Sequence, residues 1–134
     1  MAEFWSDRQV THFVRETLGC GCPDEVFQKI EREVIAEIGT IQQLVRIAIG
    51  DKLLIYLARP GDWVALNRSI APLVSAGRSD RDCHHYNRFR LVAGMVDPVD
   101  TDEQIEAERL FKAAAKGDEK LHLHFVSRAE LKGF

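Results

Sequence analysis

The sequence lacks any long hydrophobic run. No segment approaches the ~20 consecutive apolar residues that a membrane-spanning helix needs. Its first residues, MAEFWSDRQV, contain no basic region followed by an apolar stretch, which is the pattern of a secretory signal peptide. We therefore expect no contact with a membrane and a location in the cytoplasm.

Positive charge is not in excess either. The chain has 18 Lys and Arg against 21 Asp and Glu, and a formal net charge of -3. Non-specific binding of nucleic acid depends on an excess of Lys and Arg, so nucleic acid is not an expected partner. Four arginines lie close together between positions 78 and 90, but Asp80 and Asp82 neutralise part of their charge. We interpret this stretch as a solvated loop rather than an anion site.

Common nucleotide-binding and hydrolase motifs are absent. The chain contains no G-x-x-x-x-G-K-[ST] loop, no G-x-G-x-x-G fingerprint, no H-E-x-x-H and no G-x-S-x-G. It also has no repeat, low-complexity tract or linker. Its 134 residues are therefore expected to form a single domain, residues 1–134, that is large enough for a hydrophobic core of its own.

Cysteines are few, and their number is odd. A secreted domain of this size usually pairs all of its cysteines, whereas three suit a reducing compartment in which thiols stay free, metal-bound or redox-active. Two of them, Cys20 and Cys22, stand one residue apart in the stretch LGCGCPDEVF. This glycine-rich corner is the most distinctive local feature of the sequence.

The spacing of these two cysteines allows them to act together. In an extended segment, residues i and i+2 point the same way, so Cys20 and Cys22 can offer two sulfurs to one metal ion or one reactant. Cys22 precedes Pro23, which is favoured at the first position of a helix, and a thiolate at a helix N-terminus has a lowered pKa. We predict a redox role for this pair. The alternative is that both are small, partly buried side chains in a tight turn.

A metal site is the second interpretation of the same corner. If the stretch around Cys83 and His84 folds towards it, Cys20, Cys22, Cys83 and His84 would form a Cys₃His set, which zinc accepts in tetrahedral geometry. The expected metal is zinc or iron.

Hydrophobic periodicity and turn residues outline the fold. Helices are predicted from about Asp7 to Leu18, from Pro23, from Asp62 and from Thr101 to Gly117. Strands are predicted at about Ile30–Ile35, Ile41–Ile49, Lys52–Ala58, Tyr86–Met95 and Lys120–Val126. Ser6 and Gln9 suit a capping box at the first helix, Gly50-Asp51 suits a two-residue hairpin turn, and Asp97-Pro98 is a turn that ends a strand. Pro72 should kink or end its helix, with the loop RSDRDCHH after it. The expected fold is α/β (α+β mixed), with a roughly five-stranded mixed sheet, three main helices and the order α-α-β-β-β-α-β-α-β.

Polar residues of the last strand offer a further pattern. His122 and His124 share one face of this strand, with apolar residues on the other face. Such a pair can bind a metal ion, but it is more often the polar face of an edge strand.

Three functions are compatible with these features. The first is a small cytosolic thiol protein that uses Cys20 and Cys22 for metal binding or redox chemistry. The second is a non-catalytic protein-interaction or homodimerisation module, with an exposed sheet edge or helix face as the contact. The third is an enzyme whose site places Arg88, Arg90, His84 and His85 around an anionic substrate.

Two resemblances accompany this interpretation. The order α-β-β-β-α-β resembles the core of the PD-(D/E)xK nuclease family, which holds a divalent metal ion with acidic residues on neighbouring strands. The matching strand here, KLLIYLA, contains no carboxylate, so the resemblance covers topology only. The corner also resembles a motif of the form LGCxCPxxVF in small uncharacterised prokaryotic proteins. That resemblance is confined to the corner and implies no activity.

Overall fold

One mixed sheet organises the chain. The computed structural model describes residues 6–19, 27–39, 41–50, 52–95 and 101–131. The strands follow one another in the sheet as β1 (Ile30–Ile38), β2 (Ile41–Ile49), β3 (Leu53–Ala58), β4 (Arg88–Met95) and β5 (Leu121–Ser127). The pairs β1–β2 and β2–β3 are antiparallel, whereas β3–β4 and β4–β5 are parallel. The predicted fold class and order of elements are confirmed.

A tight turn joins β2 to β3. The amide of Lys52 donates a hydrogen bond of 3.0 Å to the carbonyl of Ile49, and Gly50 has a φ of +58°. Glycine adopts this conformation without steric cost, which is why a Gly-X pair suits a short hairpin turn. The hairpin predicted at Gly50 is therefore confirmed.

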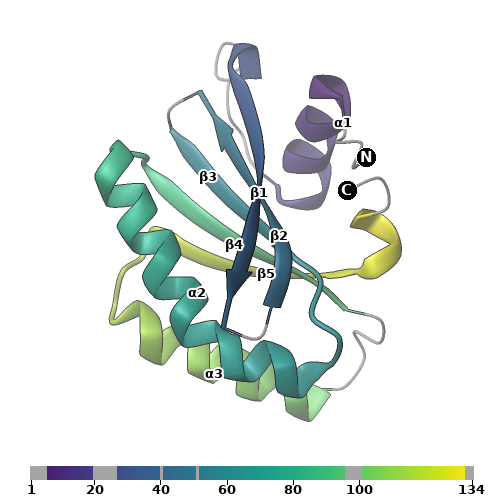
Figure 1. The fold of residues 1–134 in the computed structure, drawn as a ribbon, viewed down its shortest axis with the longest axis vertical. Coiled ribbons are helices and arrows are strands. Elements are labelled where there is room, and N and C mark those ends of the chain that lie inside the picture. The colour runs from purple at the N-terminus through teal and green to yellow at the C-terminus, as the bar shows by residue number, and fades with distance from the viewer. Residues whose placement is uncertain (1–5, 20–26, 40, 51, 96–100, 132–134) are drawn as a thin grey trace.

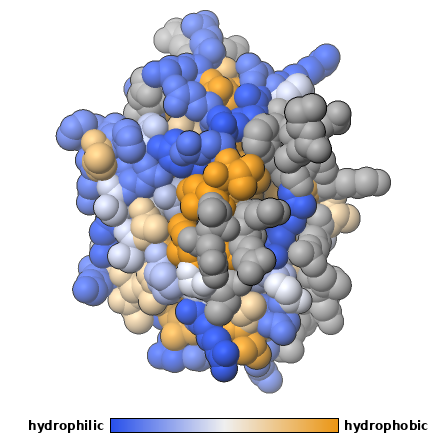
Figure 2. Space-filling view, viewed as in Figure 1, coloured by the Kyte–Doolittle hydropathy of each residue, from blue (hydrophilic) through white to orange (hydrophobic). Residues whose placement is uncertain are grey.

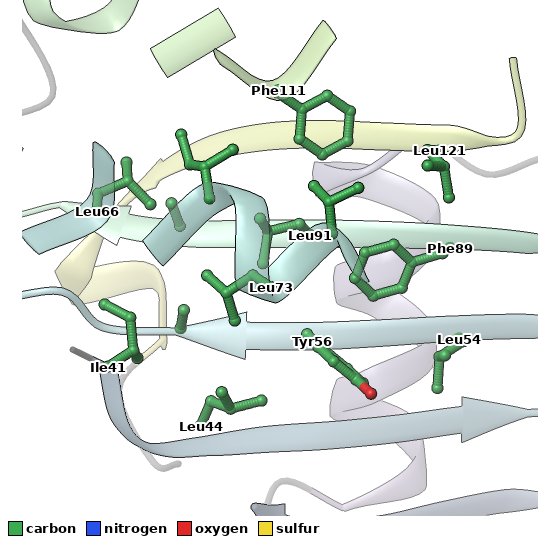
Figure 3. Close-up of a cluster of buried hydrophobic side chains, with 14 of the residues drawn as sticks. Ile41, Leu44, Leu54, Tyr56, Leu66, Leu73, Phe89, Leu91, Phe111 and Leu121 are labelled. Atoms are coloured by element: carbon green, nitrogen blue, oxygen red, sulfur yellow. The ribbon is translucent and has the colours of Figure 1, made fainter. Parts of the chain in front are cut away.

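Two helices lie side by side on one face of the sheet, α2 (Trp63–His84) and α3 (Thr101–Ala115) (Figure 1). Asp62 caps α2, because its carboxylate accepts a 2.8 Å hydrogen bond from the amide of Ala65. Under these helices, Tyr56 and Phe89 meet edge to face, with ring centroids 4.9 Å apart (Figure 3). The remaining large side chains of this core, labelled in Figure 3, include Leu54, Leu66, Leu73, Leu91, Phe111 and Leu121.

The opposite face of the sheet carries the N-terminal helix α1 (Asp7–His12), which continues as a π-helical turn, η1 (Phe13–Thr17). Ser6 caps α1 and forms the predicted capping box with Gln9. Apolar residues of both segments pack against strand residues; this second core includes Val10, Phe13, Val14, Leu18, Ile47, Ile55 and Val92. The sheet is thus covered on both faces, and all of β3 is buried.

Helix α2 does not break at Pro72. It runs unbroken from Trp63 to His84, so most of the predicted loop RSDRDCHH forms its last turns, and only His85 lies beyond it as the left-handed C-cap. Proline removes one helical hydrogen bond. However, buried residues on both sides of Pro72, such as Ile70 and Leu73, hold the two halves of the helix against the sheet.

The arginines of this supposed loop are not solvated. Arg78 donates hydrogen bonds of 3.0 and 2.5 Å to the carbonyls of Ala114 and Ala115, at the C-terminus of α3. Arg81 forms a 2.7 Å ion pair with Asp118. Arg78 therefore meets carbonyls that a helix end leaves unpaired, and Arg81 meets a carboxylate just beyond it, so the two arginines join α2 to the C-terminal end of α3.

The ends of other helices and strands can be compared with those predicted from the sequence. Gly117, with a φ of +81°, follows the end of α3 as predicted, and β1 extends beyond the predicted strand to Ile38. The helix predicted from Pro23 and the turn predicted at Asp97-Pro98 lie outside the described residues. In the part of the chain that is described, no helix has the length and apolar character needed to cross a membrane.

We predict that Gly77→Ala destabilises the protein. A Cβ atom at Gly77 would lie 2.3–2.6 Å from ring carbons of Phe89, which is fully buried and held by Tyr56. Overpacking of this kind outweighs the helix propensity of alanine, and the free energy of unfolding should fall by roughly 1–3 kcal/mol. Urea denaturation measures the change. Gly61→Ala, where a Cβ would meet nothing within 4 Å, should stay within about 0.5 kcal/mol of the parent. Equal stabilities for the two variants would contradict the packing.

Candidate anion-binding site

Strand β4 carries two arginines on the face of the sheet against which α1 packs. Phe89 and Leu91 belong to the core beneath α2 and α3. Side chains alternate along a strand, so Arg88 and Arg90 project from the opposite face. Arg88 is exposed, whereas Arg90 is partly buried.

Two histidines of β5 accompany these arginines. Leu121 belongs to the core beneath the helices, so His122 and His124 project from the same face as the arginines. Nη1 of Arg88 lies 2.8 Å from Nε2 of His122, and Nη1 of Arg90 lies 2.8 Å from Nε2 of His124. We call these four side chains the arginine–histidine face.

The hydrogen bonds fix the state of the histidines. A guanidinium can only donate, so each Nε2 atom accepts and the ring proton of the neutral imidazole resides on Nδ1. Burial, followed by the charge of Arg90, lowers the pKa of His124 to about 4 and lowers the pKa of His122 in the same way. Because the Nε2 lone pairs already accept from arginine, the structure favours the polar face of an edge strand over a metal-binding histidine pair.

Arg90 is a partly desolvated cation that has no counter-charge within the described part of the chain. Among the residues that the structure describes, no carboxylate bonds to Arg88 or Arg90, and the Nε atom of Arg90 is buried without a partner. Burial and the charge of Arg88 lower the pKa of Arg90. An isolated cation in such a place is unfavourable, and an anion from solution would relieve it.

The other buried arginines are paired. Arg46 on β2 donates to Asp80 on α2 through Nε at 2.6 Å and Nη2 at 2.8 Å. Arg81, as described above, is bonded to Asp118, and this hydrogen bond raises its pKa. Arg90 therefore differs from these two arginines, because its partner is a neutral histidine and theirs are carboxylates.

The Asp80 carboxylate is fully occupied. Besides Arg46, it accepts a hydrogen bond of 2.7 Å from the hydroxyl of Tyr56, and Nδ1 of His84 lies 2.9 Å from it. Burial alone would raise the pKa of Asp80, but the hydrogen bonds from Arg46 and Tyr56 outweigh burial and lower it. With its oxygens saturated, this carboxylate ties α2 to β2 and β3 and is not free to react.

The predicted thiol and metal residues are only partly described. Cys83 is a free, exposed cysteine in the last turn of α2, and the adjacent His84 is bonded to Asp80. Cys20 and Cys22 lie outside the described residues. Within the described ranges, no group of three or more His, Cys, Asp or Glu side chains could hold a metal ion. The redox and metal roles of the cysteine pair stay predictions.

The arginines of the third hypothesis have other neighbours than expected. Sequence reasoning placed Arg88 and Arg90 with His84 and His85, the histidines nearest in the chain. The structure gives the arginines His122 and His124 instead, on the neighbouring strand. Alternation along each strand already showed which side chains share a face, but only the pairing of β4 with β5 brings the two sets together.

The nuclease-like interpretation finds no support in the strands. β2 and β3 contain no carboxylate, and the carboxylate that touches Tyr56 of β3 is the saturated Asp80. Comparison with family models, with curated proteins and with solved structures gives no match to this chain.

We predict opposite effects on stability for two arginine substitutions. Arg90→Met removes a partly desolvated cation that no described carboxylate neutralises, and the free energy of unfolding should rise by roughly 0.5–1.5 kcal/mol. Arg46→Met removes the arginine from the largely buried Asp80 carboxylate and leaves it only the Tyr56 hydroxyl and His84 as partners, so the free energy of unfolding should fall by about 3–5 kcal/mol. Urea denaturation near pH 7 measures both. A marked loss of stability in Arg90→Met would show that Arg90 is structural.

We also predict a pH dependence that comes from His124. Folding lowers the pKa of His124 from 6.5 to about 4. Between pH 6.5 and pH 4, His124 is therefore protonated in the unfolded chain and neutral in the folded chain. Stability is therefore complete above pH 6.5 and falls as the pH drops towards 4. Asp80 acts in a separate window, below 3.8. His124→Asn should flatten the slope of unfolding free energy between pH 6.5 and 4. An unchanged slope would contradict the environment described for His124.

Proposed function

We propose that this protein binds an anionic ligand with a phosphate-type group at the arginine–histidine face. The observation that carries the proposal is Arg90, which is partly desolvated, adjacent to a second cation and not neutralised by any described carboxylate. Natural proteins tolerate unfavourable charge clusters of this kind chiefly where a ligand uses them.

The chemistry of the four side chains fits such a ligand. A guanidinium presents several N–H donors in a planar fork that matches the oxygens of phosphate, sulfate or carboxylate. Each arginine uses Nη1 for its histidine, which orients the fork and leaves further donors. The neutral histidines add no charge, so Arg88 and Arg90 supply the electrostatic attraction.

Binding, rather than a reaction, is the activity that these residues support. The basic Nε2 atoms of His122 and His124 already accept hydrogen bonds from the arginines, so neither ring offers a free general base at that atom. The arginines have no acidic proton to give near neutral pH. The anion would be held and oriented at this face.

Observations on the surface do not favour the interaction module predicted from the sequence. Figure 2 shows a face with a hydrophobic area near its centre and hydrophilic side chains above it. Among the described residues, the large hydrophobic side chains that stay exposed are Val34, Val64 and Ile105, on three different elements. The edge strand β1 also carries Glu31 and Glu33, and charged side chains on an edge discourage pairing with a second copy. A protein partner and a thiol function stay separate predictions.

We predict that inorganic phosphate binds saturably and shifts the Arg88 and Arg90 signals in ¹H–¹⁵N correlation spectra at pH 7.5. Arg88→Gln and Arg90→Gln each remove one charge-assisted contact, so each should weaken binding roughly tenfold, which corresponds to about 1.4 kcal/mol. Arg109→Gln is the matched control, because it makes the same change in charge on the exposed surface of α3.

Two outcomes would contradict the proposal. In the first, phosphate shifts no signals of β4 and β5; in the second, Arg90→Gln and Arg109→Gln weaken binding equally. The second outcome would mean that phosphate responds to the overall charge of the protein rather than to the arginine–histidine face.

A further inference from the structure

We propose that the ligand is a compact molecule with two anionic groups, one for each arginine of the face. This inference rests on the proposed function and specifies the ligand class for the same site. It follows from a repeat in the structure: the pair Arg88–His122 and the pair Arg90–His124 are two copies of one arrangement.

The two pairs are related by a shift of two residues along both strands. Each pair joins residues 34 positions apart, through the same two atoms and at the same distance of 2.8 Å. Strands β4 and β5 are parallel, so moving two residues along one matches moving two residues along the other. At ~3.3 Å per residue, this shift places the two arginines about 6.6 Å apart along β4.

This repeat holds the guanidinium groups side by side. Each one is bonded at Nη1 to its own histidine, and β4 itself is hydrogen-bonded between β3 and β5. A ligand with two anionic groups at a matching separation meets both arginines where they already are, so it loses little conformational freedom on binding.

The charge of the whole chain favours a small ligand over a polymer. Acidic residues outnumber basic ones and the net charge is -3, so a long polyanion would be repelled outside the arginine–histidine face. A small molecule with two phosphate groups on a short carbon chain is affected mainly by the local field of Arg88 and Arg90. We infer a bisphosphorylated metabolite-sized ligand.

Isothermal titration at pH 7.5 with matched probes tests this inference. The probes are butane-1,4-diol bisphosphate, butyl phosphate and inorganic pyrophosphate, in which the two phosphorus atoms are closer together. The butanediol bisphosphate should bind at least about tenfold more tightly than butyl phosphate, since the second contact is intramolecular. Pyrophosphate should bind more weakly than the butanediol compound because it is too short to reach both arginines.

The variants Arg88→Gln and Arg90→Gln make the test specific. Each should reduce the affinity for the bisphosphate to that for butyl phosphate, whereas Arg109→Gln should preserve the preference. Equal affinities for butyl phosphate and the bisphosphate, both weakened by Arg90→Gln, would overturn the two-group inference and leave the proposed function intact. No arginine-dependent binding of any probe would overturn both. Tighter binding of a ten-nucleotide oligothymidylate than of the bisphosphate would overturn the preference for a compact ligand.

Discussion

Strands β3 and β4 lie in the middle of a sheet that is covered on both faces, and this position constrains the rest of the molecule. Every residue of β3 is buried, and the side chains of β4 must alternate between the core under α2 and α3 and the opposite face. On the face covered by α2 and α3, Phe89 and Leu91 fill the core. The same alternation places Arg88 and Arg90 on the opposite face. The pairing of β4 with β5 places His122 and His124 beside them.

The buried arginines show how the fold separates structural charge from available charge. Arg46 is held by both oxygens of Asp80, and the hydroxyl of Tyr56 completes the group, so removing Arg46 or Asp80 leaves the other without its opposite charge. Arg90 has a neutral histidine where Arg46 has a carboxylate. The first arrangement joins α2 to the sheet. The second leaves a positive charge unmatched within the described chain, which is a property of binding sites rather than of cores.

Much of the fold could be predicted because its signals are local. Alternation and β-branched residues located the strands, Gly50 marked the hairpin, and Ser6 and Asp62 marked the starts of helices. Pro72 misled because its local effect, the loss of one hydrogen bond, is smaller than the burial of the helix on either side. The supposed loop that followed was wrong for the same reason, and its arginines instead meet the end of α3 and Asp118.

The sequence by itself determined that Arg88 shares a face with Arg90, and His122 with His124. Side chains alternate along any strand, because this period of two residues is a property of the backbone. The sequence also determined the composition of the LGCGCPDEVF corner, whose chemistry stays a prediction. Only the tertiary structure decided that the two basic pairs are neighbours, because the β4–β5 pairing joins residues more than thirty positions apart through α3. It likewise decided that Asp80 neutralises Arg46 and not Arg90, because α2 continues past Pro72 and brings the carboxylate of Asp80, eight residues further on, to one face of the sheet alone.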